Sequence, residues 1–188
     1  MTRDQLEHAV RAACDVTRER DMIIVGSQAI LGEHPDAPAG LRQSMEIDLI
    51  VRNRPELADV IDGALGEMSA FHRLHGFYAQ GLSPDSAILP AGWERRLVLV
   101  RNGNTRDCSG WCLESHDLAS AKLAAFRDKD RDFVRTMLIE SFIDEATLHE
   151  RVATLSIDDE LRARLVIWIA TTARDIRSGR DREGEGAA

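Results

Sequence analysis

The sequence has few cysteines, few lysines and few aromatic residues, and it contains no long apolar run. Its three cysteines, Cys14, Cys108 and Cys112, do not form the regular framework of a small disulfide-bonded secreted domain. A membrane-spanning helix needs about 18 or more consecutive apolar residues, and the polar segment 1–7 does not have the composition of a signal peptide. We therefore expect a cytoplasmic protein with no membrane contact.

The spacing of Cys108, Cys112 and His116, one donor every four residues, suggests a zinc site at first sight. However, 108–113 is expected to be a strand, in which four residues span about 13 Å. Two sulfur atoms that share a zinc ion each lie about 2.3 Å from it. We therefore do not expect zinc here.

The basic residues are unusual in their type rather than in their number. A net charge of −8 argues against a broad basic surface for nucleic acid, although it leaves a local basic groove open. Only two of the 24 basic residues are lysines, Lys122 and Lys129, and both fall in one short stretch. Because lysine offers a compact point charge and arginine a planar fork, this scarcity indicates a position that needs an ammonium group.

Periodicity gives the order of elements along the chain. The expected elements are a capped helix over 2–20, strands over 22–25 and 45–51, a helix over 53–66, an irregular strand over 71–80, a hairpin over 97–113 with a tight Asn102-Gly103 turn, and helices from 115 onward. This order predicts an α/β (α+β) fold, with a twisted mixed sheet of four to five strands flanked by helices and a C-terminal helical bundle. We expect a core over 1–114, a helical region over 115–178 packed on it, and a disordered tail over 179–188.

Two features have alternative interpretations. The segment Gly32–Gln43 is rich in proline, alanine and glycine, and it is either a mobile flap or a plain exposed connection. Trp93 either stacks on a base or closes a turn over the core.

The segment 45–51 alternates apolar and polar side chains, which is typical of a strand with one apolar face. Glu46 and Asp48 then point the same way, with Cα atoms about 6.5 Å apart. Both carboxylates can reach one divalent ion, or two ions about 3.5–4 Å apart. Oxygen ligands of this kind favour Mg²⁺ or Mn²⁺.

The segment Val25-Gly26-Ser27 ends a short buried strand and leads into a helix that begins near Gln28. A helix that starts directly after a strand directs unpaired backbone N–H groups toward a bound anion, most often phosphate. Gly26 allows close approach of the backbone, and Ser27 adds a hydroxyl group. Either element alone is a weak signal, because most short turns and paired acidic residues are structural.

In combination, Val25-Gly26-Ser27 and Glu46-Ile47-Asp48-Leu49 resemble the signature of the DNA polymerase beta superfamily of nucleotidyltransferases. The resemblance covers roughly 22–142 and is greatest to small bacterial nucleotidyltransferase-like proteins and to nucleotidyltransferase toxins of toxin–antitoxin and abortive-infection systems. It implies a minimal nucleotidyltransferase fold, in which Gly26 and Ser27 hold the phosphates of a nucleoside triphosphate and Glu46 and Asp48 hold the metal. The sequence departs from the signature at Glu46, where the family usually has aspartate.

In the resembling toxins, a lysine on the helix after the sheet and a later aspartate complete the site. Lys122 and Asp130 match these positions, and Asp132 is the alternative acid. The resemblance implies transfer of a nucleoside monophosphate to an acceptor hydroxyl on transfer RNA, on a protein or on a small molecule. The alternative is a catalytically degenerate protein that acts as a binding or regulatory partner, for example within a toxin–antitoxin pair. From the residues alone, Lys122 is equally compatible with a side chain that extends from the edge of an apolar helix face.

Overall fold

The computed structural model describes residues 1–185 and divides into two compact units. The first unit comprises Met1–Ala87 and Gly92–Glu114, and the second comprises Ile88–Ala91 and the chain from Ser115 onward. The predicted fold class is confirmed, since a five-stranded mixed sheet is flanked by helices and followed by a helical region.

The elements of the first unit are α1 (Arg3–Thr17), β1 (Asp21–Ile24), η1 (Ser27–Gly32), η2 (Ala39–Arg42), β2 (Glu46–Val51), η3 (Pro55–Leu57), α2 (Ala58–Leu65), α3 (Ala70–His75), β3 (Tyr78–Gly81), η4 (Pro84–Ser86), η5 (Trp93–Arg95), β4 (Val98–Val100) and β5 (Ser109–Cys112). Those of the second unit are α4 (Ser115–Ala125), α5 (Asp128–Ile139), α6 (Glu145–Ala153) and α7 (Asp159–Glu185).

The sheet has the strand order β3-β2-β1-β5-β4. β1 pairs parallel with β5 and antiparallel with β2, β2 pairs parallel with β3, and β4 pairs antiparallel with β5. As a result, β1 and β5 finish at the end of the sheet where β2, β3 and β4 begin. We call this end the motif end, because it holds both Gly26 and Glu46.

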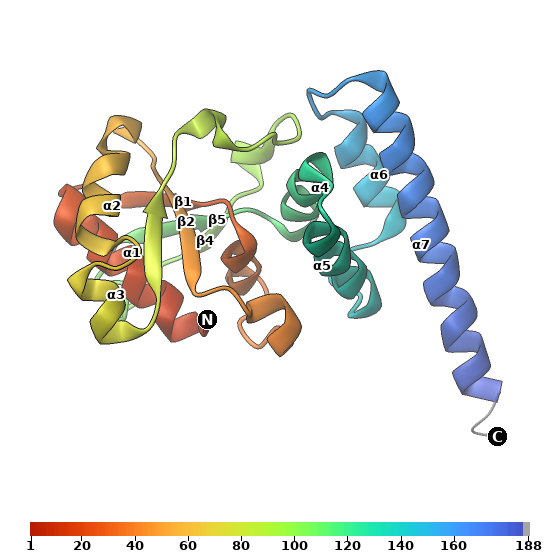
Figure 1. Ribbon diagram of the computed structural model, residues 1–188, viewed down its shortest axis with the longest axis horizontal. Coiled ribbons are helices and arrows are strands. Elements are labelled where there is room, and N and C mark those ends of the chain that lie inside the picture. The colour runs from red at the N-terminus through yellow and green to blue at the C-terminus, as the bar shows by residue number, and fades with distance from the viewer. Residues whose placement is uncertain (186–188) are drawn as a thin grey trace. The chain divides into compact units, whose positions relative to one another are not determined.

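The two faces of the sheet differ in burial. One face is fully buried and carries Met22, Ile24, Leu49 and Val51. The helices α1, α2 and α3 gather along this face (Figure 1). The second face carries Asp21, Ile23, Asp48, Ile50 and Trp111, and its polar members are only half-buried.

The helix α1 starts where the sequence predicts. Thr2 and Gln5 form a complete capping box, and the apolar stripe of the helix packs into the core. Gly110 packs against Val10 of α1. A β-carbon built on Gly110 would lie 3.0 Å from Val10 Cγ2. Glycine at this position therefore allows α1 to pack closely on β5.

The predicted irregular strand over 71–80 is wrong in its first half, which forms α3. The Ser69 hydroxyl accepts a hydrogen bond from His72 N–H at 3.1 Å and caps the start of this helix. Gly76 then ends it in the left-handed region, with φ 73°, and β3 follows. The cap and the glycine outweigh the aromatic residues that favoured a strand.

The predicted tight turn at Asn102-Gly103 is also wrong, because the connection between β4 and β5 is longer. Asn102 Oδ1 accepts hydrogen bonds from the backbone N–H groups of Asn104 and Thr105, at 2.9 and 3.2 Å. The left-handed residues of this loop are Arg106 and Asp107, with φ 51° and 60°. The local Asx turn at Asn102 thus replaces the two-residue hairpin.

The segment 32–43 does not form a wholly exposed connection. Ala37 and Leu41 are buried, and η2 forms within the segment. The N-terminal amino group of Met1 donates to the carbonyl oxygen of Ser44 at 3.3 Å, directly after the segment. These contacts tie the segment to the first unit.

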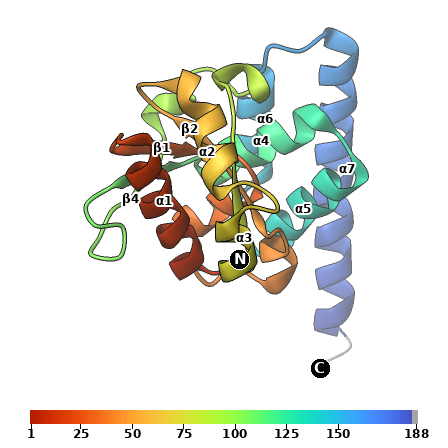
Figure 2. The same cartoon turned by 60° about the vertical axis from the view of Figure 1, so that its left-hand side comes forward.

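The second unit consists of helices packed around an apolar core, with α7 as its longest helix (Figure 2). Phe126 adopts a left-handed conformation, φ 51°, and separates α4 from α5. The fully buried Asp117 of α4 lies 3.2 Å from the Arg151 guanidinium of α6. This buried ion pair links two of the helices.

The C-terminal prediction differs from the structure. The expected disordered tail begins at residue 179, but α7 continues to Glu185. Residues 186–188 of the expected tail lie outside the described residues. Within the described part of the chain, no helix combines the length and apolarity needed to cross a bilayer.

Candidate active site

The strand β2 presents two carboxylates on one face at the motif end. Glu46 and Asp48 are half-buried, and they alternate with the fully buried Ile47 and Leu49. This alternation matches the sequence pattern and orients both acids away from the helix-covered face. Met45, which the pattern also placed on the apolar face, lies before the strand and is exposed.

The most tightly packed contact described for the site is that of the Asp48 side chain with Gly26. The Val25 N–H donates to the Asp48 carbonyl oxygen at 3.2 Å, which aligns the end of β1 with β2. A β-carbon built on Gly26 would lie 1.5 Å from Asp48 Oδ2 and 2.6 Å from Asp48 Cγ. A side chain at position 26 would displace this carboxylate, so the two halves of the sequence motif pack against each other.

This contact changes the interpretation of Gly26. The sequence suggested that glycine lets the backbone approach a phosphate, whereas the structure shows that it makes room for Asp48. The helix expected after Ser27 is the short 3₁₀ helix η1, in which the Ala29 N–H already donates to the Gly26 carbonyl oxygen at 2.9 Å. Ser27, which follows Gly26 and begins η1, is half-buried.

Two residues at the motif end were not identified as candidates from the sequence. Tyr78 of β3 lies opposite Glu46 in the register. Burial raises the pKa of Tyr78, and the charges of Glu46, Glu67 and Asp48 raise it further. As the only tyrosine in the chain it was visible in the sequence, but nothing in the sequence predicted its partner strand.

The other unidentified residue is Glu114, which follows β5 at the motif end. The N–H of the preceding Leu113 donates to the Ile24 carbonyl oxygen at 3.1 Å, so the chain is still paired with β1 at this point. Glu114 thus lies just beyond a predicted strand, and it does not form a three-residue metal group with Glu46 and Asp48 within the described part of the chain.

Lys122 and Asp130, proposed from the resemblance, lie together in the second unit. Lys122 Nζ is 3.5 Å from Asp130 Oδ1, and Asp130 is buried with its side chain 1% exposed. Arg127 Nε also contacts Asp130, at 2.6 Å, and the Lys122 ammonium lies 5.4 Å from the ring centroid of Phe133. The alternative acid, Asp132, is exposed on α5.

The acidic pair offers oxygen ligands of the kind that a divalent metal prefers. Within the described part of the chain, no three His, Cys, Asp or Glu side chains form a group that could hold a metal ion. Glu46 and Asp48 supply two carboxylates on one strand face, and Asp48 is packed in a glycine cradle. Mg²⁺ is commonly held by one or two carboxylates together with substrate phosphates, so this donor set fits Mg²⁺ bound with a nucleotide.

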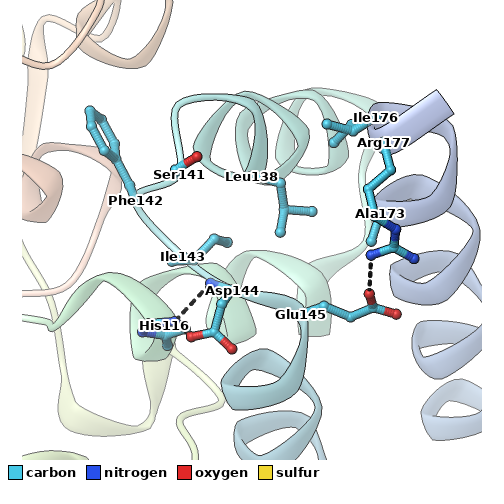
Figure 3. A pocket seen from close by; sticks show the side chains of 10 residues that line it. All are labelled: His116, Leu138, Ser141, Phe142, Ile143, Asp144, Glu145, Ala173, Ile176 and Arg177. Atoms are coloured by element: carbon cyan, nitrogen blue, oxygen red, sulfur yellow. Dashed lines mark hydrogen bonds and ion pairs between the residues drawn. The ribbon is translucent and has the colours of Figure 1, made fainter. Parts of the chain in front are cut away.

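The second unit contains a separate cavity of about 320 Å³ between α5, α6 and α7 (Figure 3). His116 Nε2 accepts a hydrogen bond from the Asp144 N–H at 3.1 Å, and Glu145 pairs with Arg177 at 2.7 Å. A hydrogen bond from Thr147 lowers the pKa of Asp144 and caps α6. The polar side chains of this cavity hold the start of α6, and none of the residues predicted for the active site lines it.

A family model described as "Nucleotidyltransferase of unknown function (DUF6036)" matches residues 4–175, and the chain belongs to this family. A comparison with curated proteins and a comparison with solved structures gave no match.

Proposed function

We propose that the chain is a metal-dependent nucleotidyltransferase that moves a nucleoside monophosphate from a nucleoside triphosphate to an acceptor hydroxyl. The single observation that supports this proposal most strongly is the cradle at Gly26, where a β-carbon would lie 1.5 Å from Asp48 Oδ2. A solvated acidic pair on an ordinary strand needs no such cradle. The family match is consistent with this chemistry.

In this proposal Glu46 and Asp48 hold Mg²⁺, or Mn²⁺, and the Ser27 hydroxyl donates to a triphosphate oxygen beside it. The metal, when bound, neutralises charge on the phosphates. The oxygen of the acceptor hydroxyl bonds to the α-phosphorus, and the bond from this phosphorus to the bridging oxygen breaks. Pyrophosphate leaves, and a carboxylate of the acidic pair takes the hydroxyl proton.

Lys122 and Asp130 belong to the second unit, and their participation stays a prediction from the resemblance. Lys122 has the compact charge suited to a phosphate, and Asp130 fixes its ammonium group at 3.5 Å. Arg127 contacts the same carboxylate, so Asp130 keeps a cationic partner when Lys122 turns toward a ligand.

The test is calorimetric titration with each nucleoside triphosphate, with and without Mg²⁺, on the wild type and on Asp48→Asn. We expect metal-dependent binding that the variant loses. If no triphosphate binds under any metal condition, the enzyme proposal is wrong. The degenerate alternative, a binding partner within a toxin–antitoxin pair, would then be tested by co-purification.

A further inference from the structure

Four exposed arginines surround Trp111 at the end of the sheet opposite the motif end. They are Arg20, Arg52, Arg101 and Arg106, which we call the arginine patch. Arg20 precedes β1, Arg52 follows β2, Arg101 follows β4 and Arg106 lies in the loop before β5. Three of them, together with Trp111, line a cavity of about 670 Å³.

Two charges of the patch have only distant and exposed acidic partners. Arg101 Nε lies 3.8 Å from Asp107, and Arg106 Nη1 lies 4.0 Å from Asp15, with all four side chains more than half exposed. Exposed ion pairs at such distances contribute little to stability and are screened by solvent. In a chain of net charge −8, this local group of cations indicates an anionic ligand.

Trp111 provides a flat surface among these charges. Its Nε1–H donates to Asp21 Oδ1 at 2.8 Å, which fixes the ring, and the Arg52 guanidinium lies 4.7 Å from the ring centroid. Leu99 lies opposite Trp111 in the register and is 47% exposed. Aromatic rings and guanidinium planes are the surfaces on which proteins stack unpaired bases.

The loop that carries Arg106 is held in place from α1. Glu7 is buried, and its carboxylate accepts hydrogen bonds from the side-chain amides of Asn102 and Asn104, both at 2.9 Å. Thr105 is fully buried in the same loop. Such prior ordering lowers the entropic cost of binding a ligand.

The patch and the acidic pair lie on one face of the same sheet. Arg52 extends the β2 ladder, because its N–H donates to the Asp21 carbonyl oxygen at 3.0 Å. Arg52 and Asp48 are four residues apart, so they share a face and are separated by about 13 Å along the strand. This length corresponds to about four nucleotides at the 3.4 Å rise of a stacked strand.

We infer that the arginine patch binds a single-stranded nucleic acid whose end reaches the acidic pair as the acceptor. The four arginines contact phosphates, and the ring of Trp111 stacks a base. The role as acceptor rests on the proposed function, whereas the binding itself does not.

The experiment measures fluorescence anisotropy of labelled single-stranded RNA and DNA oligonucleotides of about 12 nucleotides, within the usual range of site sizes. The patch variant is Arg101→Ala/Arg106→Ala. The matched control, Arg135→Ala/Arg174→Ala, removes the same charge from exposed positions on α5 and α7. Thermal unfolding of both variants verifies that each is folded.

Four phosphate contacts on a single strand give a salt slope of about −2.8, or about a 50-fold loss of affinity between ~50 and ~200 mM salt. With two arginines removed, we expect a slope of about −1.4 and a loss of about sevenfold over the same interval. The control variant should keep the wild-type slope. Comparison of the RNA and DNA oligonucleotides shows which of the two nucleic acids binds more tightly.

Equal slopes and affinities in the patch variant and the wild type would overturn the inference. So would displacement of the oligonucleotide by a free triphosphate at equal phosphate concentration, which would make the patch a site for small anions. Asp48→Asn should bind the oligonucleotide like the wild type. Loss of triphosphate binding with retention of oligonucleotide binding thus separates failure of the proposed chemistry from failure of this inference.

Discussion

Replacing Gly26 with alanine would place a methyl group on the Asp48 carboxylate. The new carbon would lie 1.5 Å from Oδ2, so this oxygen has to move by about 2 Å to reach an ordinary contact of about 3.5 Å. The backbone of Asp48 is held in place, because its carbonyl oxygen accepts a hydrogen bond from the Val25 N–H at 3.2 Å. The side chain must therefore rotate while the backbone stays in place.

The rotation has two consequences of different size. Insertion of a methyl group into a packed site typically costs about 1–3 kcal/mol of stability. Misplacing a metal ligand is expected to cost more in function, since loss of the groups that orient such ligands lowers metal affinity by about 10- to 100-fold. We therefore expect Mg²⁺-dependent triphosphate binding to weaken at least about tenfold while the protein remains folded.

The matched control is Gly63→Ala, on the exposed side of α2, where an added β-carbon meets nothing within 4 Å. Alanine is favoured over glycine within a helix by about 0.8–1.0 kcal/mol, so this variant should be slightly more stable and bind triphosphate normally. Thermal unfolding and calorimetric titration of both variants measure the two effects. If Gly26→Ala is as stable as the wild type and binds Mg²⁺ and triphosphate equally well, the cradle has no role.

Three further predictions concern the rest of the chain. Lys122→Ala should lower nucleotidyl transfer, measured by incorporation of a labelled triphosphate, whereas Lys129→Ala, exposed on α5, should leave both activity and stability unchanged within about 0.5 kcal/mol. Asp117→Ala should destabilise the second unit by about 3 kcal/mol in urea unfolding, at the lower end for a buried pair because Arg151 is 23% exposed. Burial of Glu7 opposes its ionisation, but hydrogen bonds from Asn104, Asn102 and Arg3 lower the pKa of Glu7 overall. The folding stability of the protein should therefore fall as the pH drops below about 4.3. The Glu7→Gln variant should lose this part of the pH dependence.

The sequence predicted those elements whose signals are local. The capping box at Thr2 and the alternation from Glu46 to Leu49 depend on residues a few positions apart, and both are present in the structure. The turn at Asn102-Gly103 failed because a side-chain hydrogen bond of Asn102 closes a different turn from the one that its sequence favours. Such competition between side chain and backbone cannot be resolved from a dipeptide.

The relation between distant segments was not predictable from the sequence. The contact of Gly26 with Asp48 requires β1 and β2 to be antiparallel neighbours in one register, and a shift of one residue would turn both acids to the other face. Tyr78 and Glu114 reach the motif end only through the pairing of β3 with β2 and of β5 with β1. No periodicity within one segment specifies which strand lies beside it.

The same register bears on Glu46, which stands where the signature of the resembling superfamily usually has aspartate. Asp48 lies directly against Gly26, and Glu46 precedes Asp48 by two residues on β2, with the two Cα atoms about 6.5 Å apart. An added methylene lengthens the side chain by about 1.5 Å, and the half-buried position of Glu46 leaves it able to extend. Because Tyr78 borders it on the adjacent strand, the longer acid can extend toward Asp48 and the turn rather than toward β3. We therefore expect the acidic pair to bind metal with glutamate in the first position.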